Sequence, residues 1–267
     1  MKNSWNFMLD QGGTFTDIIG IRPDGKVVTK KILSKQNIPK YNPIQSGISI
    51  ILQENPDFKK YPISKINIGT TIGTNSLLER KGAKVLFCVT KGFKDNFIIG
   101  NQKRDNLFLR HHQRPSPLYS KVIEIDERIS KTGKTIIDIN YEKTYSLLEK
   151  NYNSGYETLS IVLINSFKFP RHEKIVKSIA KKIGYGFISS SFEVCPMINF
   201  TSRGFTTLAD NYLNPIVKKF TDNVHGSFNQ TRINYMQSSG FLCTKDNFSG
   251  KTSILSGPAG GIRAGIK

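Results

Sequence analysis

Two apolar segments flank a glycine pair in the sequence Phe7-Met8-Leu9-Asp10-Gln11-Gly12-Gly13-Thr14-Phe15-Thr16-Asp17-Ile18-Ile19-Gly20. Adjacent glycines let the backbone take a positive φ in a tight turn, so the pattern predicts a β-hairpin that turns at Gly12 and Gly13. A further turn signal, Pro23-Asp24-Gly25, is followed by alternating residues over 26–33. We therefore expect residues 7–33 to form a three-stranded antiparallel meander.

The same turn has the features of a phosphate-binding loop. Because Gly12 and Gly13 carry no side chain, a ligand can approach the backbone amides of the turn, and the hydroxyls of Thr14 and Thr16 add donors. A carboxylate beside a polyphosphate needs a cation between them, so Asp10 is expected to hold Mg²⁺ or its waters. The alternative is an ordinary hairpin with turn-forming Gly, Asp and Thr. These residues alone leave both interpretations open.

Composition narrows the class of protein. The chain has 267 residues and 37% hydrophobic content, enough to build the core of one large domain or two ordinary ones. Its longest apolar runs, such as residues 159–164, fall far short of the roughly 20 residues that a membrane helix needs. The net charge of +19 comes from scattered lysines rather than a basic run. A generally basic surface is therefore expected, with neither nucleic acid nor a membrane as partner.

The N-terminus and the cysteines indicate a cytoplasmic protein. The first residues lead directly into the first predicted strand, without the apolar core of a signal peptide. Cys88, Cys195 and Cys243 lie far apart and belong to no metal-binding pattern. We expect all three to be reduced thiols, with Cys88 in the core.

A second candidate binding segment follows the meander. The pattern predicts a strand over residues 63–68, a helix over 71–81 with Gly82 at its end, and a strand over 85–90. Strand, helix and strand in this order predict a parallel pair joined by a crossover.

The connection into the predicted helix at residue 71 is rich in hydroxyls and glycines. Free amides and the helix dipole make such an N-terminus attractive to anions, so its candidate ligand residues are Thr70, Thr71, Gly73, Thr74 and Asn75. The alternative is that Thr70 and Thr71 cap the helix while the glycines pack against a neighbour.

Further along, helices and strands alternate in a second α/β run. Helices are expected from Pro43 and over residues 141–153, 170–182 and 200–224, the last kinked or broken at Pro215, and strands over 159–164, 187–189 and 233–236. A glycine loop over residues 255–262 opens another helix. The polar segment 100–120 is a candidate functional loop, in which Arg104, Arg110 and Arg114 could meet a carboxylate. The neighbouring His111 and His112 lack further ligands for a metal site.

Several motifs, taken in order, resemble those of one family. They are Asp10–Asp17, Gly69–Gly82, Gly92-Phe93-Lys94-Asp95, Gly100-Asn101-Gln102, Glu124–Arg128, Ser202-Arg203-Gly204, Met236–Gly240 and Ser256–Gly261. The sequence resembles the hydantoinase A and ATP-dependent 5-oxoprolinase family, and within it the 5-oxoprolinases. The resemblance implies an α/β fold of the ribonuclease-H-like, actin-like ATPase type, a meander followed by parallel β-α-β units, with nucleotide held between two lobes. It also implies ATP- and Mg²⁺-dependent opening of 5-oxo-L-proline to L-glutamate, with release of ADP and phosphate.

The hairpin matches the first phosphate loop of that family. The match assigns the phosphates to Gly12, Gly13 and Thr14, and Mg²⁺ or its waters to Asp10, the candidate catalytic residue. Position 11 is Gln, where 5-oxoprolinases usually carry Arg and hydantoinases usually carry Val. This difference weakens the assignment of 5-oxoproline as the substrate.

Members of the family are several hundred residues longer. The resemblance therefore implies an N-terminal part of such an enzyme, truncated, with one domain over residues 5–190 and the start of a second over 191–267. The small-molecule substrate would be 5-oxoproline or a related cyclic amide, and another chain would supply the missing C-terminal lobe. The alternatives are an N-methylhydantoinase or ATP-dependent ketone carboxylase subunit, and an inactive fragment that acts by binding partners.

Overall fold

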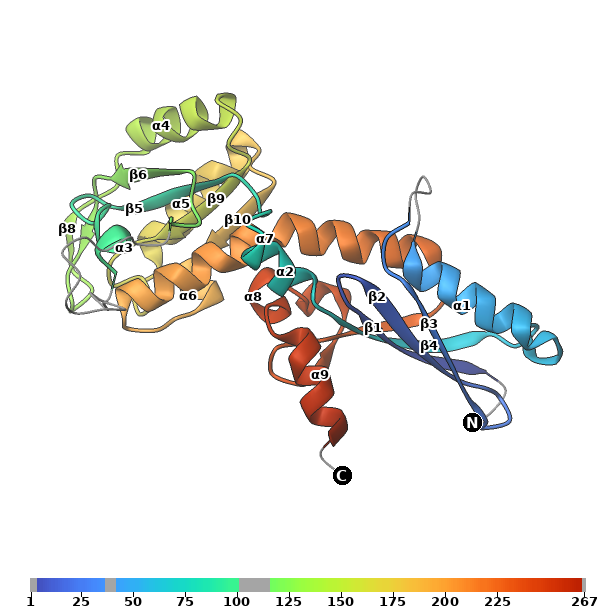
Figure 1. Cartoon of the computed structure of the whole chain (residues 1–267). Helices are drawn as coiled ribbons and strands as arrows, with labels where there is room; N and C mark the ends of the chain where they lie inside the picture. The colour runs from blue at the N-terminus through green and yellow to red at the C-terminus, as the bar shows by residue number, and fades with distance from the viewer. Residues whose placement is uncertain (1–3, 37–41, 101–115, 266–267) are drawn as a thin grey trace, which may run out of the picture. The chain divides into compact units, whose positions relative to one another are not determined.

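The computed structural model describes residues 4–36, 42–100 and 116–265 (Figure 1). They form two compact units, one that comprises the described residues up to Gly82 and from Ile216 onward, and one that spans Ala83–Pro215. The chain thus leaves the first unit and returns to it. The two domains expected from the sequence, residues 5–190 and 191–267, come from the resemblance to a family and not from compactness. That division stays a prediction.

A six-stranded sheet forms the first unit, in the order β12-β11-β4-β1-β2-β3. The strands are β1 (Trp5–Gln11), β2 (Phe15–Ile21), β3 (Val27–Leu33), β4 (Ile63–Thr70), β11 (Arg232–Met236) and β12 (Leu242–Cys243). Consecutive strands β1, β2 and β3 pair antiparallel, whereas β4 runs parallel to both β1 and β11. The predicted meander is confirmed, and Gly12 and Gly13 lie in its first turn.

Alternating side chains give this sheet a buried and an open face. In β1, Trp5, Phe7 and Leu9 are buried, whereas Met8 and Asp10, on the other face of the strand, are exposed. This period of two is the expected consequence of the strand pleat.

Helix α1 (Pro43–Glu54) covers the buried face. Its start is capped by Asn42, whose side-chain oxygen accepts the amide of Ile44 at 3.1 Å, and Pro43 occupies a first-turn position that needs no amide donor. Gly47 permits close contact with the sheet, since an added Cβ would overlap the Ile18 side chain. The helix buries Ile44, Ile48 and Ile51.

The second unit is built on a parallel sheet in the order β10-β9-β5-β6. Its strands are β5 (Val85–Thr90), β6 (Lys121–Ile125), β9 (Thr158–Val162) and β10 (Phe187–Ser190). All residues of β5 and β9 are buried, as expected for central strands of a parallel sheet. Helices α4 (Tyr141–Asn153) and α5 (Arg171–Ile183) contact each other and share one core with the sheet, which includes Cys88 as predicted.

Shorter elements complete the described chain. They are η1 (Pro56–Phe58), α2 (Ile72–Leu78), α3 (Asn96–Ile99), β7 (Arg128–Ile129), β8 (Thr135–Ile137), α6 (Ser191–Val194), η2 (Lys245–Asn247), α8 (Gly250–Ser253) and α9 (Ser256–Gly265). The predicted loop side chains Arg104, Arg110, His111, His112 and Arg114 lie outside the described residues. Among the residues that are described, no helix combines the length and apolarity of a membrane span.

Three expectations drawn from the sequence, one about strand pairing and two about helices, are wrong. The predicted parallel pair over residues 63–90 does not form, because β4 pairs with β1 and β11 while β5 belongs to the sheet of the second unit. Helix α2 is shorter than expected: it ends at Leu78, and Arg80 adopts a left-handed φ of 55°. The long helix α7 (Phe200–Ser227) continues through Pro215, so the predicted break is absent, and the alternative of a kink stays a prediction.

Candidate functional site

Three segments meet at one end of the sheet of the first unit: the β1–β2 turn, the start of α2 and the start of α9. The amide of Thr71 donates to the Gln11 carbonyl at 3.1 Å, and the Thr70 hydroxyl donates to the same oxygen at 3.3 Å. From the far end of the chain, the Ser256 hydroxyl donates to the Thr70 carbonyl at 2.5 Å. This end carries the carboxyl termini of the parallel strands β1 and β4, which is where open α/β sheets bind ligands.

Crowding, rather than backbone conformation, explains the two glycines of the turn. Neither Gly12 nor Gly13 has a left-handed φ, so that expectation is wrong. An added Cβ on Gly12 would lie 3.1 Å from the Phe15 carbonyl oxygen, and one on Gly13 would lie 3.0 Å from Asn75 Nδ2. The turn and α2 therefore approach each other closely, and the exposed side of the turn is bare backbone.

The start of α2 is braced by its neighbours. Its first amide, that of Ile72, donates to the Thr70 hydroxyl at 3.2 Å, and Asn75 Nδ2 donates to the Thr71 hydroxyl at 3.1 Å. An added Cβ on Gly73 would overlap Ser253. The helix start therefore has little freedom to move relative to the hairpin.

Asp10 lies at the end of β1, directly opposite Asp17 across the antiparallel pair and beside Gly69 across the parallel pair. An added Cβ on Gly69 would come within 3.5 Å of Asp10 Oδ1, so the glycine leaves space beside the carboxylate. Partial burial, and then the charge of Asp17, raise the pKa of Asp10. Both effects disfavour the ionised carboxylate, and a bound cation would offset them.

The described residues hold no cluster of three or more acidic, His or Cys side chains suited to a metal. A magnesium ion at Asp10 would therefore complete its shell with water and phosphate oxygens, as this ion commonly does.

The predicted binding residues divide into two groups. Thr14 is exposed at the turn, together with the backbone of Gly13. Three other predicted hydroxyls are engaged inside the protein: Thr16 is fully buried with its hydroxyl 2.8 Å from Ser34 Oγ, Thr70 bonds to Gln11, and Thr74 donates to the Ile254 carbonyl. Their contacts with a nucleotide stay predictions, because each hydroxyl would have to exchange its present partner.

The contribution of α8 and α9 to this end of the sheet was not foreseen. An added Cβ on Gly257 would lie 2.7 Å from Thr71 Cγ2, so α9 packs directly on the start of α2. The glycine-rich run 256–261 was a local signal for a helix start, yet nothing in it identified a partner 186 residues earlier.

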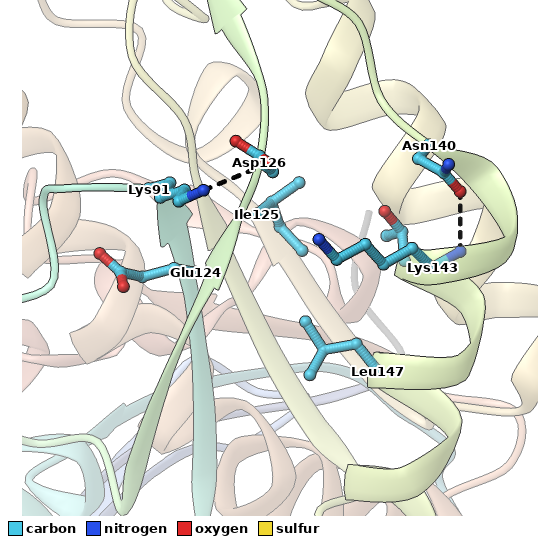
Figure 2. A pocket seen from close by; sticks show the side chains of 8 residues that line it. Lys91, Glu124, Ile125, Asp126, Asn140, Lys143 and Leu147 are labelled. Atoms are coloured by element: carbon cyan, nitrogen blue, oxygen red, sulfur yellow. Dashed lines mark hydrogen bonds and ion pairs between the residues drawn. The ribbon is translucent and has the colours of Figure 1, made fainter.

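The second unit offers a competing site, a pocket of about 240 Å³ beyond the ends of β5 and β6 (Figure 2). Three of its charged groups have partners: the Lys91 ammonium lies 3.3 Å from Asp126, and the Glu124 carboxylate accepts the amide of Gly92 at 2.7 Å. It is lined by Lys91, Glu124, Ile125, Asp126, Asn140, Lys143, Thr144 and Leu147. Two carboxylates in its lining, those of Glu124 and Asp126, make it a poorer polyphosphate site than the glycine turn.

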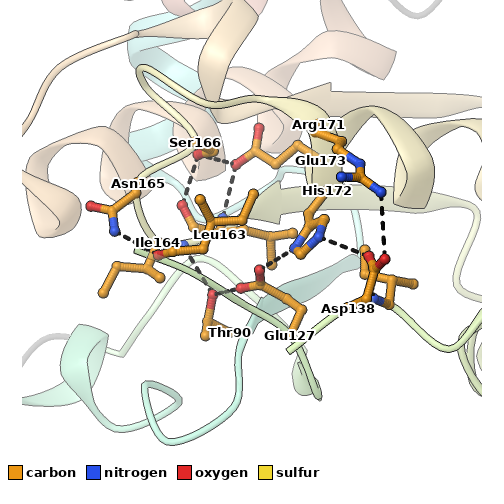
Figure 3. Close-up of polar contacts among 12 residues, drawn as sticks. Thr90, Glu127, Asp138, Leu163, Ile164, Asn165, Ser166, Arg171, His172 and Glu173 are labelled. Atoms are coloured by element: carbon orange, nitrogen blue, oxygen red, sulfur yellow. Dashed lines mark hydrogen bonds and ion pairs between the residues drawn. The ribbon is translucent and has the colours of Figure 1, made fainter. Parts of the chain in front are cut away.

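A buried polar network lies beyond the ends of β5 and β9 (Figure 3). Glu127, with Thr90 bonded to one oxygen, lies 2.6 Å from Nδ1 of His172, and Glu173 accepts the Leu163 amide at 2.8 Å. These buried groups satisfy one another and fix the loops after the strands, so they act as scaffold.

The sequence matches two family models. Residues 6–184 match the model described as "Hydantoinase/oxoprolinase N-terminal region", and residues 203–267 match "Hydantoinase/oxoprolinase". The chain is 38% identical to a 5-oxoprolinase of Dictyostelium discoideum and 36% identical to 5-oxoprolinase 1 of Arabidopsis thaliana, over 98% of its own length in each case. It spans 24% and 23% of those relatives, respectively.

Two solved structures share the fold. The chain superposes on nucleotide-free acetone carboxylase with a TM-score of 0.80 at 21% identity, covering 97% of this chain and 40% of that one. It superposes on the ATP-dependent caprolactamase of Pseudomonas jessenii with a TM-score of 0.81 at 24% identity, covering 98% and 40%. These likenesses show that the chain shares the fold of these two proteins, a mixed α/β fold with parallel strands as expected.

Proposed function

Because the chain belongs to the hydantoinase/oxoprolinase family, we propose that it is the phosphate-binding part of an ATP-dependent enzyme that opens a cyclic amide. The proposed substrate is 5-oxo-L-proline, and the products are L-glutamate, ADP and phosphate. The observation that carries the proposal is the close packing of the bare Gly12-Gly13 turn against the start of α2, at the carboxyl ends of β1 and β4.

In this proposal the exposed backbone of the turn binds the phosphates. Amides of Gly13 and Thr14, with the Thr14 hydroxyl, donate to phosphate oxygens, and Asn75 and the braced start of α2 fix the turn. Asp10 would hold a hydrated cation beside Gly69, where the lack of a side chain leaves the carboxylate uncovered. When bound, Mg²⁺ would supply the positive charge that lets a carboxylate and a polyphosphate lie side by side.

The chemistry explains the need for ATP. An amide carbon is a poor electrophile, and transfer of the γ-phosphoryl group to the amide oxygen makes that carbon open to attack by water. Catalysis of phosphoryl transfer consists mainly of positioning and charge stabilisation, to which preorganised backbone donors contribute. The contribution of this chain is therefore one rigid set of donors and one carboxylate.

A second candidate function keeps the same phosphate chemistry with another substrate, as an N-methylhydantoinase or a ketone carboxylase subunit. The likeness to acetone carboxylase and the 25% identity to a caprolactamase subunit alpha of Pseudomonas jessenii support it. In both cases the remainder of the enzyme, supplied by another chain, is part of the proposal. So is cytoplasmic residence, which the three unpaired cysteines support.

Calorimetric titration of the chain with ATP, with and without Mg²⁺, tests the proposal. We expect binding that requires Mg²⁺ and weakens about tenfold or more in Asp10→Ala, a step of ~1.4 kcal/mol. Asp24→Ala, which removes an exposed carboxylate from another turn, is the matched control and should bind as the wild type does. If the folded chain does not bind ATP, or if Asp10→Ala binds it equally well, the hairpin is an ordinary turn and the proposal fails.

A further inference from the structure

The open face of the meander carries a set of apolar side chains, here called the outer face. They point away from α1, and the strand register places Met8 opposite Ile19 and Phe15 opposite Leu33. Their exposed fractions are Met8 44%, Phe15 44%, Ile19 41%, Val27 57% and Leu33 46%. Met8, Ile19 and Val27 lie on one side of the Asp10–Asp17 pair, and Phe15 and Leu33 lie on its other side, next to the turn. Exposed apolar side chains that gather on one face in this way mark an interaction site.

A helical layer already lies on this side of the sheet, over its other half. Helix α9 contacts β4 and β11, and an added Cβ on Gly260 would lie 3.9 Å from Met236 Cγ. Met236 and Asn234 lie on the same face of β11. Asn234 pairs with Asn67 of β4, and Asn67 pairs with Met8 of β1. Met236 therefore lies on the same side of the sheet as the outer face. In the part of the chain that the structure describes, the layer covers β4 and β11 and leaves the apolar side chains of β1, β2 and β3 exposed.

The charges on this face define where a partner can sit. A row of charged side chains runs across the three strands: Asp10 lies opposite Asp17, and Lys31 bonds to Asp17 at 2.9 Å. This row lies between the turn and the pair Met8 and Ile19. A segment seated over Met8, Ile19 and Val27 would therefore leave the carboxylate of Asp10 open to a nucleotide. Its neighbour in the layer would be α9.

We propose that the outer face binds an amphipathic helix from the remainder of the enzyme, the part present in the relatives and absent here. This inference rests on the proposed function, which requires that remainder. Sheets in α/β folds bury both faces against helices, so a second helix beside α9 completes the layer. The chain covers 24% of the Dictyostelium relative and 40% of the caprolactamase structure, so most of each relative is available to provide it. A second copy of this chain is the competing occupant.

The test mixes the purified chain with a separately produced polypeptide, the portion of the Dictyostelium discoideum 5-oxoprolinase that has no counterpart here. The affinity is measured by calorimetry for the wild type, for Ile19→Glu and, independently, for Val27→Glu. A charge buried in an apolar interface is strongly unfavourable, so both variants should bind at least about tenfold more weakly. The matched control is Ile136→Glu, at a side chain of the second unit that is 63% exposed, and it should bind as the wild type does.

Circular dichroism and ATP titration of each variant separate loss of docking from loss of folding, since neither Ile19 nor Val27 belongs to the phosphate site. Equal binding by the wild type and both outer-face variants overturns the inference, as does failure of the wild type to bind. A concentration-dependent dimer of the chain alone that Ile19→Glu abolishes assigns the face to a second copy, and also overturns it. Face-dependent docking without ATP binding would instead contradict the proposed function.

Discussion

At the scale of single residues, Glu173 is the most constrained carboxylate among the described side chains. It is fully buried and accepts hydrogen bonds from Ser191 Oγ at 2.6 Å and from the Leu163 amide at 2.8 Å. The buried Arg203 donates to the same Ser191 hydroxyl at 3.0 Å. Burial raises the pKa of Glu173, and these hydrogen bonds oppose the rise. The carboxylate thus links the loop after β9 to α6, and the Ser191 hydroxyl extends this network to Arg203 of α7.

We expect Glu173→Ala to lower the free energy of unfolding by about 3–5 kcal/mol, because it leaves the buried donors of Leu163 and Ser191 without their acceptor and removes the opposite charge near Arg203. Denaturant unfolding followed by circular dichroism measures the change. Glu157→Ala, at an exposed position of the same unit, should stay within about 0.5 kcal/mol of the wild type. A comparable loss in both variants would show that the network contributes no more than a surface side chain.

At the scale of elements, α7 contains two glycines in opposite surroundings. An added Cβ on Gly204 would overlap the ring of Phe97, which also stacks edge-on against Phe87 at 4.6 Å between ring centroids. An added Cβ on Gly226 would meet nothing within 4 Å. The same substitution should therefore have opposite effects at the two positions.

Gly204→Ala should destabilise the protein by about 1–2 kcal/mol, since overpacking outweighs the gain in helix propensity. Gly226→Ala should stabilise it by about 0.5 kcal/mol, because it gains propensity without a clash near the helix end. Thermal unfolding of the two variants in parallel gives the comparison. If both shift the midpoint in the same direction, propensity alone governs this helix.

Local patterns predicted the elements well and their partners poorly. The meander, α4 and the strands around residues 85–90 and 158–162 follow from periodicity and turn residues, which act over short distances. The pairing of β4 with β1 and β11 does not, because a strand–helix–strand pattern does not specify which sheet each strand joins.

The candidate site shows the same limit. Sequence named the hairpin and the start of α2 as two separate candidate binding segments, and the structure brings them together. It did not foresee that Ser256 and Gly257 brace that start, since contacts between distant segments leave no local signal. Nor did it foresee that Gly12 and Gly13 are required by close approach instead of by a left-handed φ.

At the scale of the whole molecule, the chain spans about a quarter of the length of the 5-oxoprolinases that it matches. The resemblance to actin-like ATPases implies a nucleotide held between two lobes. The described chain provides one glycine turn, one carboxylate and the braced start of α2. Its exposed apolar side chains also include Phe241 at 62% and Leu255 at 54%, in the same unit as the outer face.

We expect the isolated chain to show no measurable 5-oxoproline-stimulated ATPase activity, even where it binds ATP. Transition-state charge on the transferred phosphoryl group needs donors on several sides, and loss of a single oxyanion-type donor already slows catalysis by ~100- to 1,000-fold. Phosphate release should appear when the remainder of the Dictyostelium enzyme is added, and Asp10→Ala should then abolish it. Robust 5-oxoproline-dependent phosphate release by the purified chain alone would show that one lobe suffices, and that the second set of donors does not govern the reaction.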